Sequence, residues 1–105
     1  MNTIDLPSAI ASGGVATTEI VIPTNQHWNI YGITIESTSL TSGLGKFYIN
    51  NSLQCISYSS NLDHASGTPI TNIGPGSKLK MVWSGLDTSG NILCNCSLLI
   101  DRIIK

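Results

Sequence analysis

Short runs in which apolar and polar residues alternate fill most of this chain, and they restrict it to β structure. Residues 78–84 (KLKMVWS) place Leu79, Met81 and Trp83 on one face and Lys78 and Lys80 on the other. A strand points successive side chains to opposite faces, so this alternation is typical of a strand with one buried face. No stretch sustains a 3.6-residue period, so no helix is predicted. Residues 91–104 repeat the alternation with Ile92, Cys94, Cys96, Leu98 and Ile100 on one side.

Turn-forming residues separate these runs at intervals of roughly ten residues. The turn Asn50-Asn51-Ser52 predicts a tight hairpin between residues 46–50 and 53–59. About seven short strands without a helix indicate an all-β, antiparallel β-sandwich of the jelly-roll type over residues 15–105. The strand order is open at this stage, and an immunoglobulin-like order is the alternative.

Residues 27–38 (HWNIYGITIEST) predict a long strand. Simple alternation places Tyr31, Ile33 and Ile35 on one of its faces and Trp28 and Ile30 on the other. At least one of the two aromatic side chains is therefore expected outside the core.

Residues 1–14, which end in PSAIASGG, are predicted to form a short extended N-terminal arm rather than part of the core. A purely solvated tail has no need of apolar residues, yet this segment contains Ile4, Leu6 and Ile10. We therefore expect the arm to become ordered on a partner, with plain disorder as the alternative.

The composition argues against several classes of partner. Charged residues make up 10% of the chain and the net charge is −1, and the basic residues form no run or stripe. Nucleic-acid binding is not expected, because it needs clustered positive charge. No apolar segment is long enough to cross a bilayer and no basic, apolar leader is present, so neither a membrane association nor a secretory signal is expected.

The stretch SGLDTSGNIL, residues 84–93, differs by one inserted residue from the Asp-Thr-Gly triplet of aspartic proteases. The insertion of Ser89 is incompatible with a dyad that depends on close apposition of two carboxylates. Asp, Ser, Gly and Asn are also typical of a hairpin loop. Asp87 is therefore predicted to cap a hairpin turn, with Gly90 or Asn91 at positive φ.

The remaining chemistry-bearing residues predict no enzyme. His27 and His64 show no ligand spacing with the cysteines, so neither a metal site nor a cofactor is expected. No nucleophile elbow and no paired carboxylates occur, so no catalytic residue is assigned. Cys55, Cys94 and Cys96 are expected to be buried thiols.

Aromatic residues are the other candidates for a surface function. Trp83 alternates with Leu79 and Met81 and is assigned to the core. Trp28 is a candidate for an interface or ligand contact, with simple burial as the alternative, and Tyr48 is a weaker case of the same kind. The candidate interface residues are thus Ile4, Leu6, Ile10, Trp28 and Tyr48.

Three stretches, IVIPTNQHWNIYGITIEST, PGSKLKMVWSG and SLLIDRI, resemble the small β-sandwich virion proteins of tailed bacteriophages. The shared features are a strand ending in Ile-Pro, an aromatic residue before a long strand, a Pro-Gly turn that opens a strand containing Trp, and a closing apolar strand. The resemblance covers roughly residues 15 to 104 and extends to the fold, because it includes no catalytic or binding residue.

The resemblance implies a non-enzymatic structural protein of the virion, a capsid decoration (cement) subunit that stabilises the shell. Its partners would be the major capsid protein or other virion proteins, with a homotrimer as the expected assembly. The mechanism would be bridging, in which the sandwich sits on the shell and the arm reaches an adjacent capsomer. The alternative is a lectin-like carbohydrate-binding module, for example at a tail or fibre tip, with the polar stretch SNLDHASG (60–67) as the first place for a glycan.

Overall fold

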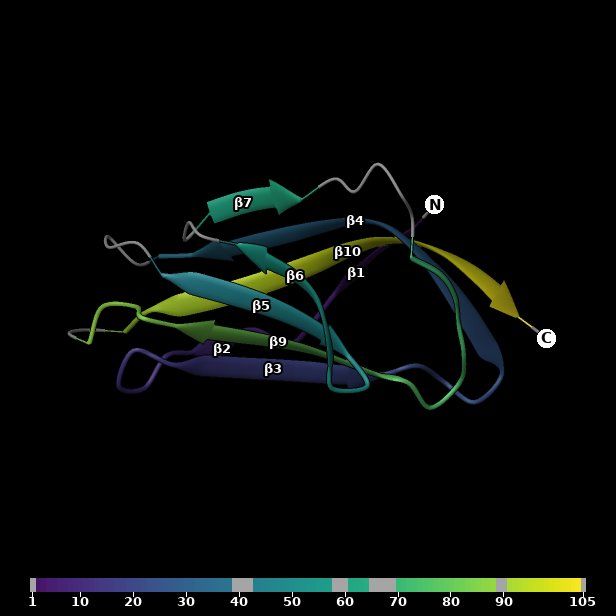
Figure 1. The fold of residues 1–105 in the computed structure, drawn as a ribbon, viewed down its shortest axis with the longest axis horizontal. Helices are drawn as coiled ribbons and strands as arrows, with labels where there is room; N and C mark the ends of the chain where they lie inside the picture. Colours follow the sequence, from purple (N-terminus) through teal and green to yellow (C-terminus); the bar gives the residue numbers. More distant parts are fainter. Residues whose placement is uncertain (1, 39–42, 58–60, 65–69, 89–90, 105) are drawn as a thin grey trace.

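The computed structural model describes residues 2–38, 43–57, 61–64, 70–88 and 91–104. Two antiparallel sheets pack face to face, which confirms the predicted β-sandwich (Figure 1). The strands are β1 (Asn2–Asp5), β2 (Ala9–Ile10), β3 (Ala16–Val21), β4 (Gln26–Ser37), β5 (Leu44–Ile49), β6 (Ser52–Ser57), β7 (Asn61–His64), β8 (Ile70–Ile73), β9 (Lys78–Ser84) and β10 (Leu93–Ile104).

The order of the strands is that of a jelly roll. One sheet, called here the β10 sheet, has the order β1-β10-β4-β7, with β2 also paired to β10 and β8 also paired to β4. The other, the β9 sheet, has the order β3-β9-β5-β6. If β1 with β2 and β7 with β8 each count as one position, eight positions divide equally between two four-stranded sheets. Successive positions lie in different sheets except at the β5–β6 hairpin, as in a jelly roll. This arrangement decides against the immunoglobulin-like order.

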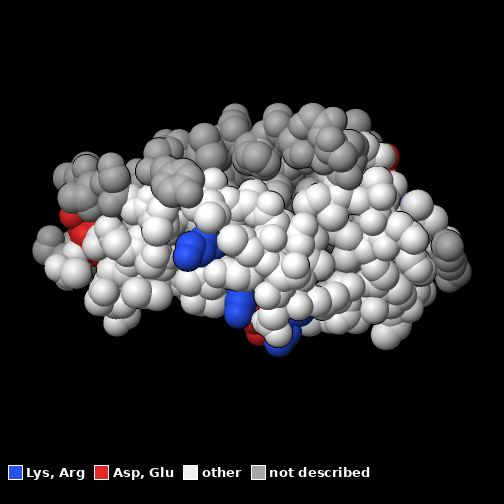
Figure 2. All heavy atoms as spheres, in the orientation of Figure 1, with Lys and Arg blue, Asp and Glu red and all other residues white. Residues whose placement is uncertain are grey.

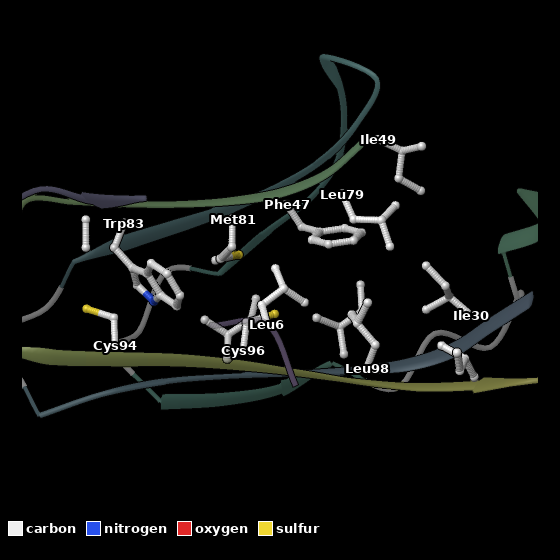
Figure 3. Packing of buried hydrophobic residues seen from close by; sticks show 14 of the residues in the cluster. Leu6, Ile30, Phe47, Ile49, Leu79, Met81, Trp83, Cys94, Cys96 and Leu98 are labelled. Atoms are coloured by element: carbon white, nitrogen blue, oxygen red, sulfur yellow. The ribbon is translucent and has the colours of Figure 1, made fainter. Parts of the chain in front are cut away.

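The core lies between the two sheets and is built from the inward positions of β9, β5 and β10. Leu79, Met81 and Trp83 face Cys94, Cys96 and Leu98 across it, with Phe47 from β5 beside Leu79 (Figure 3). The alternation predicted for β9 and β10 is therefore confirmed. Each large side chain removed from water here contributes about 1.5–3 kcal/mol of favourable transfer free energy.

The faces predicted for β4 are wrong in part, because the strand contains a β-bulge. Ile100 of β10 is opposite Ile30 and Leu99 is opposite Gly32, so Tyr31 is an additional residue on β4. A bulge inserts one residue and reverses the alternation beyond it. Trp28 and Ile30 before the bulge and Ile33 after it are consequently all buried on the same side.

The β5–β6 hairpin is confirmed, and two asparagines make its turn. Asn50 has φ 50° and Asn51 has φ 66°, the left-handed values that a two-residue type I′ turn requires. Asn50 also ties the turn to β9, because its side-chain Oδ1 accepts a hydrogen bond of 2.9 Å from the amide of Lys78.

The connection around Asp87 is not the predicted hairpin. It leads from β9 to β10, which belong to different sheets, so it crosses the end of the sandwich. Leu86 is buried there, and its amide donates a hydrogen bond of 3.1 Å to the carbonyl of Gly14. Asp87 is half-buried. The positive φ in this connection is at Gly85, at 68°, whereas Gly90 lies outside the described residues.

The N-terminal segment is extended, as expected, but it is docked on its own sandwich. β1 pairs antiparallel with β10, so that Ile4 is opposite Leu98 and Asp5 is opposite Ser97. Leu6 is 2% exposed within the core, and its amide donates a hydrogen bond of 2.9 Å to the carbonyl of Cys96. Residues 2–6 are thus the edge strand of the β10 sheet and the start of its core, and not an arm held away from it.

Candidate interaction surfaces

The structure does not bring the five predicted interface residues together. Leu6 and Trp28 are buried, at 2% and 4% exposure. This corrects the assignment of Leu6 to an interface, and for Trp28 it favours the alternative of simple burial. The Trp28 Nε1 donates to Gln26 Oε1 at 2.8 Å, so its polar atom is satisfied within the chain. Ile4 is half-buried against the core, and Ile10 is exposed on β2. Tyr48 lies on the opposite sheet.

The outer face of the β9 sheet, called here the β9 face, is basic. On β5 and β9 the inward positions are buried, so Lys46, Lys78 and Lys80 take the outward positions. In Figure 2, blue Lys and Arg atoms lie near the middle of the visible face and at its lower edge, where red atoms of an acidic side chain adjoin them. The Lys80 Nζ lies 5.5 Å from the centroid of the Tyr48 ring, within the range of a cation–π contact.

The strand register places two of these lysines opposite valines and the third opposite a carboxylate. Lys46 is opposite Val82, and Lys78 is opposite Val21. Glu19 on β3 is opposite Lys80 and is the acidic residue of the face within the described chain. The sequence did not reveal this cluster, because its members come from segments more than thirty residues apart that only the β5–β9 pairing joins.

The outer face of the β10 sheet, called here the β10 face, is acidic. Asp5 on β1 and Glu36 on β4 lie on either side of β10, and Asp101 takes an outward position on β10 itself. Asp5 Oδ1 accepts a hydrogen bond of 2.7 Å from the Ser97 hydroxyl. Asp101 also has an interaction within the structure.

Two adjoining hollows indent the β10 face, and both are lined by Glu36 and Asn95. One has a volume of about 180 Å³ and includes Leu93; the other has a volume of about 140 Å³ and includes Asp5 and Ser97. The Ser8 hydroxyl donates to Asn95 Oδ1 at 2.5 Å at the edge of the second hollow. The hollows therefore present carboxylate, amide and hydroxyl groups close together.

An open groove of about 760 Å³ runs between β2 and β3, where the edges of the two sheets meet. Ile10 and Val15 contribute exposed apolar side chains to it. The Thr18 hydroxyl donates a hydrogen bond of 2.6 Å to the carbonyl of Pro7 and joins the two edges. In the part of the chain that the structure describes, β3 has a strand neighbour on one side only, so its other side is available for pairing.

The three cysteines are free thiols. Cys94 and Cys96 are buried in the core, as predicted, whereas Cys55 on β6 is half-buried. Burial raises the pKa of all three thiols. For Cys96, burial first and then the nearby Cys55 and Asp5 raise the pKa to about 12. The Cys96 thiol therefore stays neutral and poorly nucleophilic at ordinary pH.

Among the described residues, no three or more His, Cys, Asp or Glu side chains gather in a way that could hold a metal ion. The same residues contain no helix long and apolar enough to cross a membrane. Within the stretch expected to offer a place for a glycan, residues 61–64 form β7, which pairs with β4, and its other residues lie outside the described chain.

Comparison with known proteins gives no family. No family model and no curated protein matches the chain. Among solved structures, it is similar to part of the insecticidal delta-endotoxin Cry8Ea1 from Bacillus thuringiensis, with 14% sequence identity and a TM-score of 0.49. The alignment covers 91% of this chain and 19% of the toxin chain, so the chain spans about a fifth of that protein's length.

Proposed function

We propose that this protein is a non-enzymatic structural subunit of a virion, a decoration (cement) protein that binds a capsid shell and stabilises it. The observation that supports the proposal best is a jelly-roll sandwich whose surface combines few charges with many exposed apolar side chains. The jelly roll is a recurrent architecture of viral capsid domains, although the fold alone does not define a function. The exposed large apolar residues are Ile10, Val15, Val21, Leu53, Leu93, Leu99, Ile103 and Ile104.

The surface suits repeated weak contacts. Interfaces between proteins are about as apolar as an ordinary surface and are depleted in charge at their centres. A subunit bound to many equivalent positions on a shell needs only modest affinity at each contact, because linked contacts add through effective concentration. Because residues 2–6 are docked on β10, the sandwich itself would provide the bridging contacts that we expected from an arm.

The test is to look for the protein in virus particles. Antibody raised against the purified chain is used to probe particles banded on a density gradient from cultures of its source. We expect the chain to band with intact particles in a constant ratio to the major shell protein. Recovery only in the soluble fraction, with bare particles at the band, would refute a role in the virion.

A carbohydrate-binding function is the second candidate, and the two hollows of the β10 face are the observation that favours it. Glu36, Asn95, Asp5 and Ser97 offer the acceptors and donors that sugar hydroxyls require. A glycan array with the purified protein tests this candidate. We expect any glycan signal to disappear in Glu36→Gln and Asn95→Ala, and an array without signal for the wild-type chain would refute it.

A further inference from the structure

The two outer faces of the sandwich carry opposite charge. Seven charged side chains decide this. Each has at least one buried neighbour in the chain, and Lys46 and Lys80 have buried neighbours on both sides, so the outward direction follows from alternation. Glu19 partly offsets the three lysines, which leaves the β9 face net positive, whereas the described outward charges of the β10 face are all negative. The β9 face has Lys46, Lys78, Lys80 and Glu19, and the β10 face has Asp5, Glu36 and Asp101.

On each face the charges lie close together. Tyr48 is opposite Lys80 and Val82 is opposite Lys46, so the two lysines are diagonal neighbours about 7–8 Å apart at the backbone. On the other face, Asp5 and Glu36 line the same hollow of about 140 Å³. The ammonium groups of one face and the carboxylate-lined hollow of the other are complementary in charge.

We propose that a second copy of this chain is the partner of both faces: the β9 face of one copy stacks on the β10 face of the next. The ammonium groups of Lys46 and Lys80 enter the hollows of the neighbouring copy, where Glu36 and Asp5 accept them. This inference rests on the proposed function, because it describes how the structural subunits contact one another.

Apolar side chains accompany the charges on both faces. Val21 and Leu53 are exposed on the β9 face, and Leu93 and Leu99 are exposed on the β10 face. The molecule measures 46 × 26 × 22 Å along its principal axes. A broad sheet face of that length is sufficient for the ~800 Å² per partner that a standard interface buries.

The distribution of charge also fixes the type of symmetry. Two β9 faces brought together by a two-fold axis would oppose lysine to lysine, and two β10 faces would oppose carboxylate to carboxylate. A contact between unlike faces avoids both repulsions. Such a heterologous contact builds a closed ring or an open stack rather than a two-fold dimer.

The experiment uses charge reversal on each face. One variant carries Lys46→Glu and Lys80→Glu, and the other carries Asp5→Lys and Glu36→Lys. Association is measured by sedimentation equilibrium at about 0.01 M and about 1 M ionic strength, where the Debye length is ~30 Å and ~3 Å. Far-ultraviolet circular dichroism and the melting temperature verify that each variant is folded.

The wild-type chain is expected to associate at low ionic strength and to dissociate at high ionic strength. Each variant alone should lose association by about tenfold or more, because both of its faces then carry the same sign. An equal mixture of the two variants should regain association, because each reversed face meets the unlike face of the other variant. Arg102→Glu is the control, since Arg102 is opposite the inward-facing Trp28 and lies on neither outer face.

A wild-type chain that stays monomeric at low ionic strength overturns the proposal, and so does a mixture that fails to regain association. Loss of association in only one of the two variants also overturns it, because the lysines and carboxylates would then have different partners. Recovery from particles is measured independently. A chain that bands with particles but does not self-associate would refute the stacking and leave the structural role standing.

Discussion

Replacement of Leu6 by alanine tests whether the N-terminal segment belongs to the folded core. The Leu6 side chain is 2% exposed and lies between the two sheets, near Met81 and Cys96 (Figure 3). Truncation of a buried leucine costs about 2–5 kcal/mol, because apolar contacts are lost and a cavity remains. Truncation of a leucine in a solvated arm changes the free energy of unfolding by about 0.5 kcal/mol or less. A docked segment and a solvated arm therefore predict losses in the free energy of unfolding that differ several-fold.

Urea unfolding followed by tryptophan fluorescence is a suitable assay, because Trp28 and Trp83 are both buried and report loss of the core. With an m-value of about 1–2 kcal/mol/M, a loss of about 3 kcal/mol lowers the unfolding midpoint by about 1.5–3 M. Ile10→Ala is the matched control, since Ile10 lies in the same segment but is 64% exposed. A midpoint for Leu6→Ala as close to wild type as that of the control would refute the docking of the segment.

Three further outcomes follow from local features. The free energy of unfolding should fall as the pH rises from about 9 toward about 12. Folding raises the pKa of the Cys96 thiol to about 12, so over this range the thiol ionises in the unfolded chain but not in the folded one. Urea titrations at several pH values should show a smaller fall for Cys96→Ala. Asn50→Ala should cost about 1–3 kcal/mol and Asn50→Gly less, since glycine accepts the φ of 50° and loses only the side-chain hydrogen bonds to the Lys78 amide and the Ser77 hydroxyl. Thermal melting compares the two variants. Gly14→Ala should lower the melting temperature more than Gly13→Ala, because both glycines have positive φ but only at Gly14 would a Cβ lie 2.9 Å from a backbone oxygen; equal shifts would contradict this reasoning.

The sequence was sufficient to predict the sandwich because most of its strands keep an uninterrupted alternation. On β9 and β10 a period of two continues over the whole inward face, and each inward residue that it assigned to the core is buried. The Asn50-Asn51 turn could also be predicted from the sequence, because few residues other than glycine and asparagine adopt a left-handed backbone conformation.

The predictions from sequence were wrong where the structure depends on pairing between strands that are far apart in the chain. The bulge at Tyr31 is visible only in the register with β10, so local alternation placed Trp28 on the wrong side of its strand. The connection around Asp87 has turn-forming residues, but its neighbouring strands belong to different sheets, and local sequence carries no information about that. Leu6 was assigned to an arm because its segment is short and rich in Ala, Ser and Gly, whereas pairing with β10 holds it in place.

The candidate surfaces were harder to predict than the core, and for the same reason. Lys46 belongs to one run and Lys78 and Lys80 to another, and nothing local indicates that they share a face. Asp5 and Glu36 come from the first and fourth strands and line one hollow only because β10 lies between them.

The central place of β10 has a consequence for biosynthesis. β10 is the last of the ten strands to be translated, yet β1 and β4 are joined to each other only through it. While the chain is being made, the β9 sheet can form its hairpin and its ladder, but the facing sheet still lacks its central strand, β10. A ribosome paused before Leu93 would therefore hold a chain whose apolar strands are open to solvent and to neighbouring nascent chains, a state that favours aggregation or chaperone binding. Translation speed through the codons for β10 should accordingly influence the yield of folded protein.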